Sequence, residues 1–78
     1  MFTAYVLKDN NGKFYKGVTG DLNRRLKEHL KGDTKTTKHM EGLSVFYTEK
    51  FKTFAEARAR ELYLKSAAGR RFLKNMGV

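Results

Sequence analysis

The chain begins with two short segments of apolar and β-favouring residues, separated by a polar turn. The segments occupy positions 3–8 and 13–19, and the four residues between them, 9–12, read Asp-Asn-Asn-Gly. Residues that suit a pleated surface, joined by asparagine and glycine, are typical of two antiparallel strands. This first part of the chain is therefore predicted to form a β-hairpin.

The length of the hairpin loop decides which side chains share a face of the sheet. A three-residue loop, with Gly12 in the left-handed conformation, places Leu7 opposite Tyr15. The same register places Tyr5 opposite Gly17 and puts Tyr5 and Tyr15 on one face, because side chains along a strand alternate between its faces. The sequence alone also allows a two-residue loop, which would change this register.

After the hairpin, the period of the apolar positions changes to four residues. Leu22, Leu26 and Leu30 recur with charged residues between them, which predicts an amphipathic helix of about three turns. Asp21 is predicted to cap this helix, because its carboxylate can accept hydrogen bonds from the free amides of the first turn. Gly32 is predicted to end it.

The middle of the chain is predicted to contain a loop, a third strand and a second helix. Residues 33–42 are polar and basic and have no period, which indicates a loop. Residues 43–51 are rich in types that suit a strand. Thr53 stands three residues before Glu56, a capping-box pattern that opens a helical run over residues 54–65.

The end of the chain is predicted to form a last short helix. Gly69 is expected to interrupt the preceding helix. A helix over residues 70–75 would then place three apolar side chains against the core, those of Phe72, Leu73 and Met76. No linker or repeat divides the 78 residues. We therefore expect one α/β domain over the whole chain, with helices flanking a small three-stranded antiparallel sheet in the order β-β-α-β-α-α.

Charge and composition narrow the class of partner. Lys and Arg number 17 against 8 Asp and Glu, which gives a formal net charge of +9 and a pI near 10.1. A chain this basic attracts polyanions such as nucleic acid. The absence of cysteine excludes disulfides, thiolate zinc sites and a thiol nucleophile. Without a leader pattern, a long apolar run or a broad apolar helix face, we expect a soluble cytoplasmic protein with no membrane partner.

Short motifs suited to phosphate chemistry recur along the chain. The hairpin carries Thr3-Ala4-Tyr5 and Tyr15-Lys16-Gly17, and later motifs occupy residues 18–29, 37–38, 45–47, 60–61, 64–66 and 69–70. In order and spacing, these motifs resemble those of the GIY-YIG nuclease superfamily, specifically its small stand-alone bacterial members. The chain departs from the pattern at Thr3, Ala4 and Lys16, but both tyrosines and Gly17 are present.

The resemblance implies an active site built from five side chains. Tyr5 and Tyr15 would line the site, with Tyr15 orienting or deprotonating the attacking water. Arg25 would contact the scissile phosphate, and its planar fork of donors suits a phosphoryl transition state. His29 would support the tyrosine and the water. Glu61 would hold Mg²⁺ or Mn²⁺, since a hydrated divalent ion needs only one or two carboxylates besides the substrate phosphate.

Each of these residues also has an ordinary structural explanation. A tyrosine in a strand is most often half-buried packing with its hydroxyl at the rim. Taken alone, Arg25 and His29 would be a solvated arginine and a surface histidine. Glu61, which follows two arginines, would be a salt-bridged surface carboxylate. Gly17 indicates either a close approach of backbone or ligand, or a bulge.

The resemblance therefore implies a metal-dependent endonuclease that hydrolyses phosphodiester bonds of plain or branched DNA. Backbone contacts would be salt-sensitive and independent of sequence. They are expected from a basic loop that includes His39 and from a set of basic residues: Arg24, Lys27, Lys35, Lys38, Lys65, Arg70 and Arg71. The alternative is a nucleic-acid-binding module of the same fold that does not cut, or cuts only when a partner protein delivers the substrate.

Overall fold

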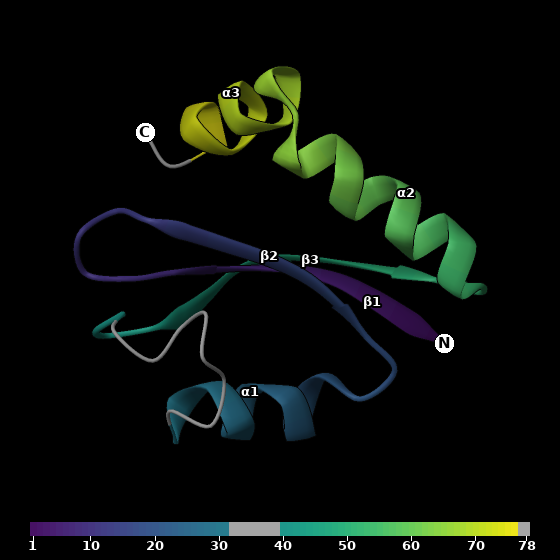
Figure 1. Cartoon of the computed structure of the whole chain (residues 1–78), viewed down its shortest axis with the longest axis horizontal. Coiled ribbons are helices and arrows are strands. Elements are labelled where there is room, and N and C mark those ends of the chain that lie inside the picture. Colours follow the sequence, from purple (N-terminus) through teal and green to yellow (C-terminus); the bar gives the residue numbers. More distant parts are fainter. Residues whose placement is uncertain (32–39, 77–78) are drawn as a thin grey trace.

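The computed structural model describes residues 1–31 and 40–76 as a three-stranded antiparallel sheet with helices on both faces (Figure 1). The elements are β1 (Phe2–Lys8), β2 (Phe14–Thr19), α1 (Leu22–Leu30), β3 (Ser44–Phe51), α2 (Phe54–Lys65) and α3 (Ala67–Met76). The predicted α/β class and element order are confirmed. Gly32 and most of the predicted loop, including Lys35, Lys38 and His39, lie outside the described residues.

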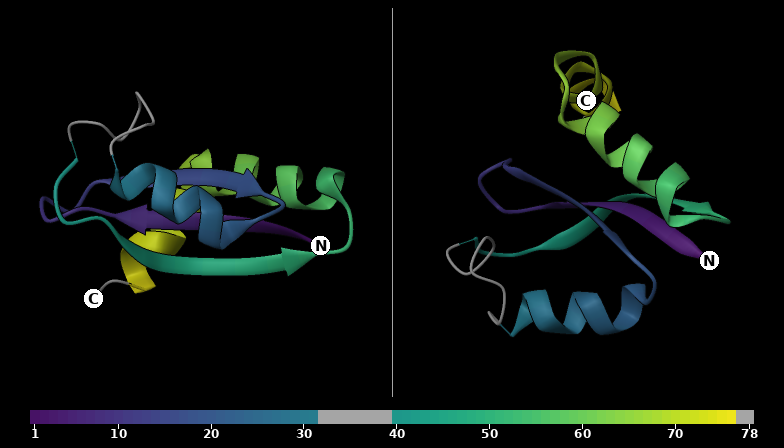
Figure 2. Two further views of the ribbon diagram at one scale, coloured as in Figure 1. Left: turned by 90° about the horizontal axis from the view of Figure 1, so that it is seen from below. Right: turned by 45° about the vertical axis from the view of Figure 1, so that its right-hand side comes forward.

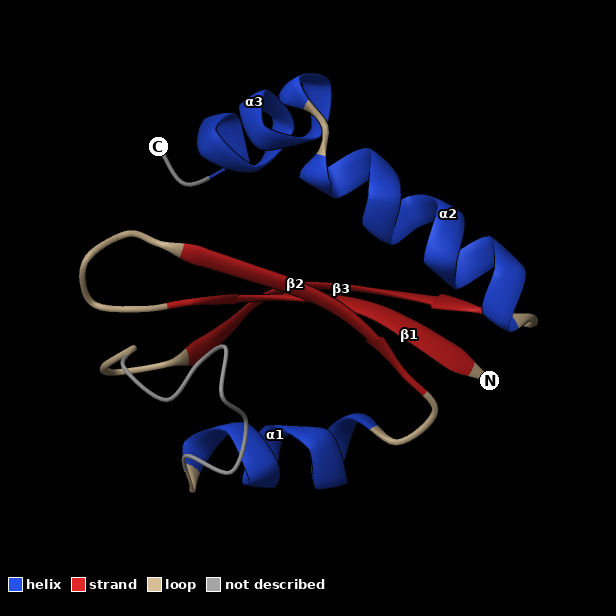
Figure 3. Ribbon diagram, in the orientation of Figure 1, coloured by secondary structure: helices blue, strands red, loops and turns tan. Residues whose placement is uncertain are grey.

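The sheet separates two layers of helices. Strand order is β2-β1-β3, so β1 is the central strand and β2 forms one edge. Helix α1 lies on one face, and α2 and α3 lie on the other, as two further views and the colouring by secondary structure make plain (Figures 2 and 3). Among the described residues, no helix is long and apolar enough to cross a membrane.

The hairpin loop has the predicted three-residue form. Gly12 has a φ of +82°, in the left-handed region that glycine adopts without a steric penalty. The carboxylate of Asp9 accepts from the backbone amides of Asn11, at 2.9 Å, and Lys13, at 2.7 Å. These bonds explain how an acidic side chain can be buried at this turn.

Strand pairing confirms the predicted register. Leu7 lies opposite Tyr15, and Tyr5 lies opposite Gly17. Tyr5 and Tyr15 therefore share the face that α1 covers.

The main core lies between the sheet and helices α2 and α3. Its centre consists of Val6, Leu64 and Leu73, each 0% exposed. Two successive residues of β3, Phe46 and Tyr47, both pack against this centre. Strict alternation would send one of them to the opposite face, but the pairing of β1 with β3 shifts register after Val6, as at a β-bulge.

Helix α1 begins as predicted, because the Asp21 carboxylate accepts from the backbone amide of Arg24 at 3.1 Å. Among its leucines, Leu22 and Leu26 are half-buried and Leu30 is exposed. The helix ends at Leu30, and Lys31 forms its C-terminal cap.

Helix α2 is capped at its start and joined to β3 through Arg60. The Thr53 hydroxyl accepts from the Glu56 amide at 3.2 Å, which is the first half of the predicted capping box. The Glu56 carboxylate returns to the Thr53 hydroxyl, at 3.0 Å, and not to the Thr53 amide. Nε of Arg60 lies 3.1 Å from Oε1 of Glu49, and Nη2 of Arg60 donates to the Tyr47 hydroxyl at 3.4 Å. Because Glu49 and Tyr47 belong to β3, these contacts join α2 to that strand.

The break between α2 and α3 falls at Ser66, so the prediction that Gly69 interrupts the helix is wrong. Ser66 has an extended backbone, and its hydroxyl accepts from the Gly69 amide at 3.2 Å, which caps a helix that starts before Gly69. A Cβ at position 69 would collide with the Tyr63 carbonyl oxygen and the Leu64 backbone. Close contact between the two helices therefore explains this glycine.

Helix α3 is longer than predicted and supplies two of the three expected core residues. It starts at Ala67, where the Ser66 cap allows, rather than at residue 70. Leu73 is fully buried and Phe72 packs against the core. Met76 is 46% exposed at the last position of the helix, so its predicted place in the core is wrong.

Candidate active site

Three polar side chains from β1 and α1 meet on the sheet face that α1 covers. The Tyr5 side chain is buried, and its hydroxyl oxygen lies 3.0 Å from Nε2 of His29. Nε of Arg25 donates to the same hydroxyl oxygen at 3.4 Å. Arg25 and His29 are one helical turn apart, so their side chains can reach one point. His29 is only 2% exposed, and the explanation as a surface histidine is therefore wrong.

Tyr15 completes this group from the edge strand. Its ring centroid lies 6.2 Å from that of Tyr5 and 4.8 Å from that of His29. Gly17 makes room for the arrangement, since a Cβ there would lie 2.7 Å from Cζ and the hydroxyl oxygen of Tyr5. The close approach expected at this glycine is that of the Tyr5 ring. We call Tyr5, Tyr15, Arg25 and His29 the tyrosine–arginine cluster.

The surroundings of the cluster fix its protonation. Burial raises the pKa of Tyr5 to about 12, although the hydrogen bond from Arg25 acts in the opposite direction. Tyr5 is therefore protonated at neutral pH and is a poor base. The hydrogen bond to Tyr5 raises the pKa of Arg25, whose guanidinium stays charged. Burial, followed by the charge of Arg25, lowers the pKa of His29. A neutral His29 can accept the Tyr5 proton at Nε2.

The lowered pKa of His29 predicts a pH-dependent stability. Because the pKa of His29 is lower in the folded protein than in the unfolded chain, the neutral imidazole stabilises the fold. This stabilisation is complete above the unfolded pKa of 6.5 and is lost as the pH falls through the folded pKa. Urea unfolding at about pH 7.5 and about pH 5 measures the difference. We expect His29→Gln to lose less stability between these pH values than the wild-type protein does. An unchanged pH response in His29→Gln would contradict the assignment.

A polar cleft of about 440 Å³ brings the edge strand together with α2 and α3. We define it by its lining residues, which are Phe14, Tyr15, Lys16, Glu61, Lys65 and Arg70. Tyr15 belongs both to this cleft and to the tyrosine–arginine cluster. The cleft therefore brings Glu61 of α2 into one site with Tyr15 of the edge strand β2.

Glu61 is buried and paired with two cations. Its side chain is 9% exposed, Nη1 of Arg58 pairs with Oε1, and Nζ of Lys65 lies 3.2 Å from Oε2. The salt-bridged interpretation is thus correct for Arg58, whereas the other preceding arginine, Arg60, pairs with Glu49, and Glu61 is not a surface residue. The side chains of Arg58 and Lys65 are 47% and 49% exposed, so both have room to turn towards solvent.

A divalent ion at this position would rely on few protein ligands. Among residues 1–31 and 40–76, no group of three or more histidine, cysteine, aspartate or glutamate side chains gathers to hold a metal. One carboxylate beside a polar cleft fits a hydrated Mg²⁺ or Mn²⁺, which keeps several waters and shares a substrate phosphate. Glu61 can supply this carboxylate if Arg58 and Lys65 no longer pair with its oxygens.

The other basic residues predicted to contact nucleic acid divide between the two faces. Arg24 and Lys27 are exposed on α1. Lys65 and Arg70 line the polar cleft, and Arg71 is exposed beside it in sequence on α3. The fold thus brings together Lys65 and Arg70, whereas Arg24 and Lys27 lie across the sheet from them.

Lys16 also lines the polar cleft, although it was not predicted from the sequence as a site residue. Alternation along β2 directs it to the face opposite that of Tyr15, towards α2 and α3. The available signal was its departure from the family motif, because a lysine stands at a strand position where an apolar residue is usual. That signal becomes interpretable only once α2 and α3 are known to cover this face.

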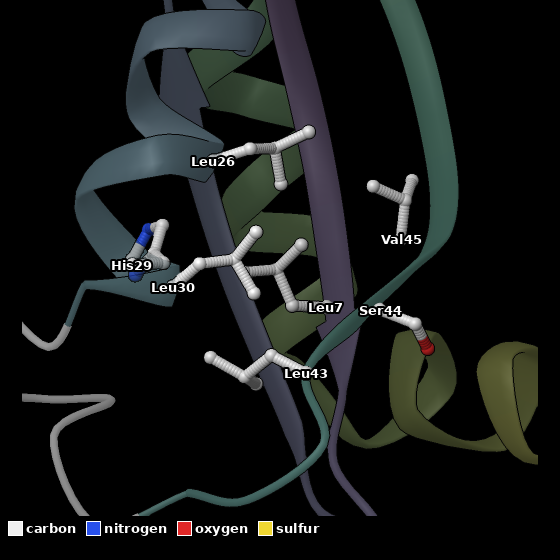
Figure 4. A pocket seen from close by; sticks show the side chains of 7 residues that line it. All are labelled: Leu7, Leu26, His29, Leu30, Leu43, Ser44 and Val45. Carbon is white, nitrogen blue, oxygen red and sulfur yellow. The ribbon is translucent and has the colours of Figure 1, made fainter.

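A separate apolar pocket of about 180 Å³ lies between α1 and the strands β1 and β3 (Figure 4). His29 and Ser44 border this pocket, and the rest of its lining is leucine and valine. These apolar side chains are Leu7, Leu26, Leu30, Leu43 and Val45. This pocket and the polar cleft share no lining residue, so the two are distinct.

Comparisons with known proteins agree with the fold and with the motifs. Residues 1–75 match the model of the GIY-YIG catalytic domain. A UPF0213 protein of Halobacterium salinarum is 36% identical over 66 residues, which cover 83% of this chain and 86% of that protein. One from Listeria welshimeri is 42% identical over 62 residues, covering 78% and 69%. The solution NMR structure of a UPF0213 protein from Bacillus halodurans has a TM-score of 0.58 at 29% identity, covering 97% of this chain and 85% of that one.

Proposed function

The chain belongs to the GIY-YIG family of nuclease catalytic domains, and we propose that it is an endonuclease that hydrolyses DNA phosphodiester bonds with Mg²⁺ or Mn²⁺. One observation carries this proposal. Tyr15 lies against His29 in the tyrosine–arginine cluster and also lines the polar cleft that contains Glu61. A phosphodiester at Tyr15 would therefore have access to a hydroxyl group, an arginine and a carboxylate.

The buried tyrosine organises the catalytic groups. Tyr5 stays protonated, accepts from Arg25 and lies within hydrogen-bond distance of His29, so it holds both side chains in place. Arg25 stabilises the negative charge that develops on the phosphoryl group, because a fixed guanidinium needs little reorganisation during the reaction. Tyr15, less buried than Tyr5, directs the water towards phosphorus. The water oxygen bonds to phosphorus as the water gives up a proton, the bond from phosphorus to the 3′ oxygen breaks, and the 3′ oxygen takes up a proton, which yields a 5′-phosphate and a 3′-hydroxyl.

Glu61 is the residue that would hold the divalent ion, together with water and a phosphate oxygen. A bound Mg²⁺ or Mn²⁺ would supply charge neutralisation for the leaving oxygen. Arg58 and Lys65 pair with the Glu61 carboxylate. If an ion bound that carboxylate, both cations could turn to the phosphate backbone, which offers them an alternative negative partner.

The second candidate is a binding module of the same fold that needs a partner protein to cut, or does not cut. The pairing of both Glu61 oxygens with Arg58 and Lys65 favours this alternative, because it opposes metal binding to the free protein. The basic residues would serve either function, since backbone contacts bind nucleic acid without sequence preference.

Cleavage of a panel of DNA structures separates the two functions. End-labelled single-stranded, duplex, nicked, flapped and branched DNA would be incubated with the protein in Mg²⁺, in Mn²⁺ or in chelator. With either ion, we expect cleavage of at least one structure and products with 5′-phosphate ends. In chelator we expect no cleavage. Binding without cleavage of any structure would favour the module.

The salt dependence of DNA binding measures the backbone contacts that both functions require. If about six phosphates are contacted, the affinity should weaken by roughly a thousandfold between about 50 and 200 mM salt.

A further inference from the structure

Three cationic side chains from three different elements line the polar cleft. Lys16 comes from β2, Lys65 from the end of α2 and Arg70 from α3. The fold brings them together because α2 and α3 turn at Ser66 over the edge strand. The convergence therefore depends on the tertiary structure and is not a run of basic residues in the sequence.

The positive charge of the cleft is not balanced by the described residues. Glu61 is the single acidic residue in its lining, and it is already paired with Arg58 and Lys65. Within residues 1–31 and 40–76, neither Lys16 nor Arg70 lies within ion-pair distance of a carboxylate. Like charges held together raise the free energy of the protein unless an anion joins them.

Lys16 is charged in surroundings that partly oppose its charge. Its ammonium nitrogen lies over the Phe14 ring, 5.8 Å from the ring centre, and this cation–π contact favours the charged form. Burial, followed by the charges of Arg70 and Lys65, lowers the pKa of Lys16. Each of these causes is a penalty on the charged ammonium, and a bound anion would offset it.

We propose that the polar cleft is a phosphate-binding site in which Lys16 and Arg70 hold a backbone phosphate of the nucleic acid next to the one that is cleaved. This inference rests on the proposed function. The volume of about 440 Å³ lies within the range of small-molecule sites. An ammonium group and a guanidinium group together supply several donors for phosphate oxygens. Because Tyr15 borders the site, a strand held here would run past the tyrosine–arginine cluster.

The test compares Lys16→Met with Lys13→Met in chelator, where cleavage does not contribute. Methionine replaces the apolar stem of Lys16 with one of similar length and removes the charged ammonium group. Lys13 is an exposed cation of the same hairpin and provides a matched control. Fluorescence anisotropy with labelled single-stranded and duplex DNA should show about tenfold weaker binding for Lys16→Met, the order expected for one charge-assisted hydrogen bond. The slope of log K against log salt should fall by about one. Lys13→Met should bind nearly as the wild-type protein does.

Two further readouts make the outcome decisive. Titration with inorganic phosphate, followed by NMR shifts of the cleft amides, tests whether free phosphate is the ligand. Equal DNA affinity in Lys16→Met and Lys13→Met would overturn the proposal. It would also be overturned if inorganic phosphate shifted the cleft amides of the wild-type protein but Lys16→Met bound DNA as tightly as the wild type. A Lys16→Met protein that binds DNA weakly, beside a wild-type protein that cleaves nothing, would support the phosphate site and contradict the nuclease function. A thermal unfolding curve for each variant excludes loss of the fold as the cause.

Discussion

Arg25→Ala is expected to lower the single-turnover cleavage rate by about 100- to 1,000-fold at saturating protein, the usual effect of losing a fixed donor to transition-state charge. Nε of Arg25 is held by the Tyr5 hydroxyl, and Nη1 pairs with Glu28 at 3.3 Å. The guanidinium is therefore oriented before substrate arrives. Its removal should affect the chemical step much more than DNA affinity.

Arg24→Ala is the matched control, because it removes the same charge from the adjacent position. Arg24 is exposed, and its backbone amide, which the substitution keeps, makes the contact with the Asp21 cap. We expect weaker binding and a cleavage rate close to that of the wild-type protein at saturation. Similar small effects from both substitutions would mean that Arg25 only attracts the substrate by its charge.

Glu61→Gln is expected to abolish metal-dependent cleavage and to weaken Mn²⁺ binding. Glutamine keeps the shape of the side chain but removes the negative charge of Glu61, the one carboxylate that we assign to the divalent ion. The fold should persist, because the cations released by the substitution, Arg58 and Lys65, are about half exposed and can be solvated. Mn²⁺ affinity is measured by electron paramagnetic resonance, and the fold by circular dichroism.

Glu41→Gln serves as the control for removal of a negative charge. Glu41 is exposed and does not line the polar cleft. Its loss should leave both Mn²⁺ binding and the cleavage rate within a small factor of the wild-type values. Full activity in Glu61→Gln, or equal effects from the two substitutions, would remove Glu61 from the proposed metal site.

Local chemistry explains why much of the fold could be predicted from the sequence. The turn residues from Asp9 to Gly12 determine the hairpin register, which in turn places Tyr5 and Tyr15 on one face. The caps at Asp21 and Thr53 likewise act within a few residues of themselves. Such signals are readable because each one depends on neighbours in the sequence.

The features that could not be predicted depend on contacts between distant elements. Gly69 looks like a helix breaker in the sequence, yet it is explained by the passage of α3 over the backbone of α2. His29 looks like a surface residue on a charged helix, yet Tyr5 and Tyr15 bury it. Lys16 gains its setting from α2 and α3, which begin only at Phe54 and Ala67.

The most direct test of a nuclease centre at the tyrosine–arginine cluster is the single-turnover cleavage rate of the DNA structure that the panel selects. The wild-type protein and Arg25→Ala, purified in parallel, would be measured in Mg²⁺ and in chelator. We predict rapid cleavage by the wild-type protein in Mg²⁺, none in chelator, and a rate about 100- to 1,000-fold lower for Arg25→Ala. Equal rates for the two proteins, or a rate that chelator does not change, would contradict a catalytic centre at this cluster.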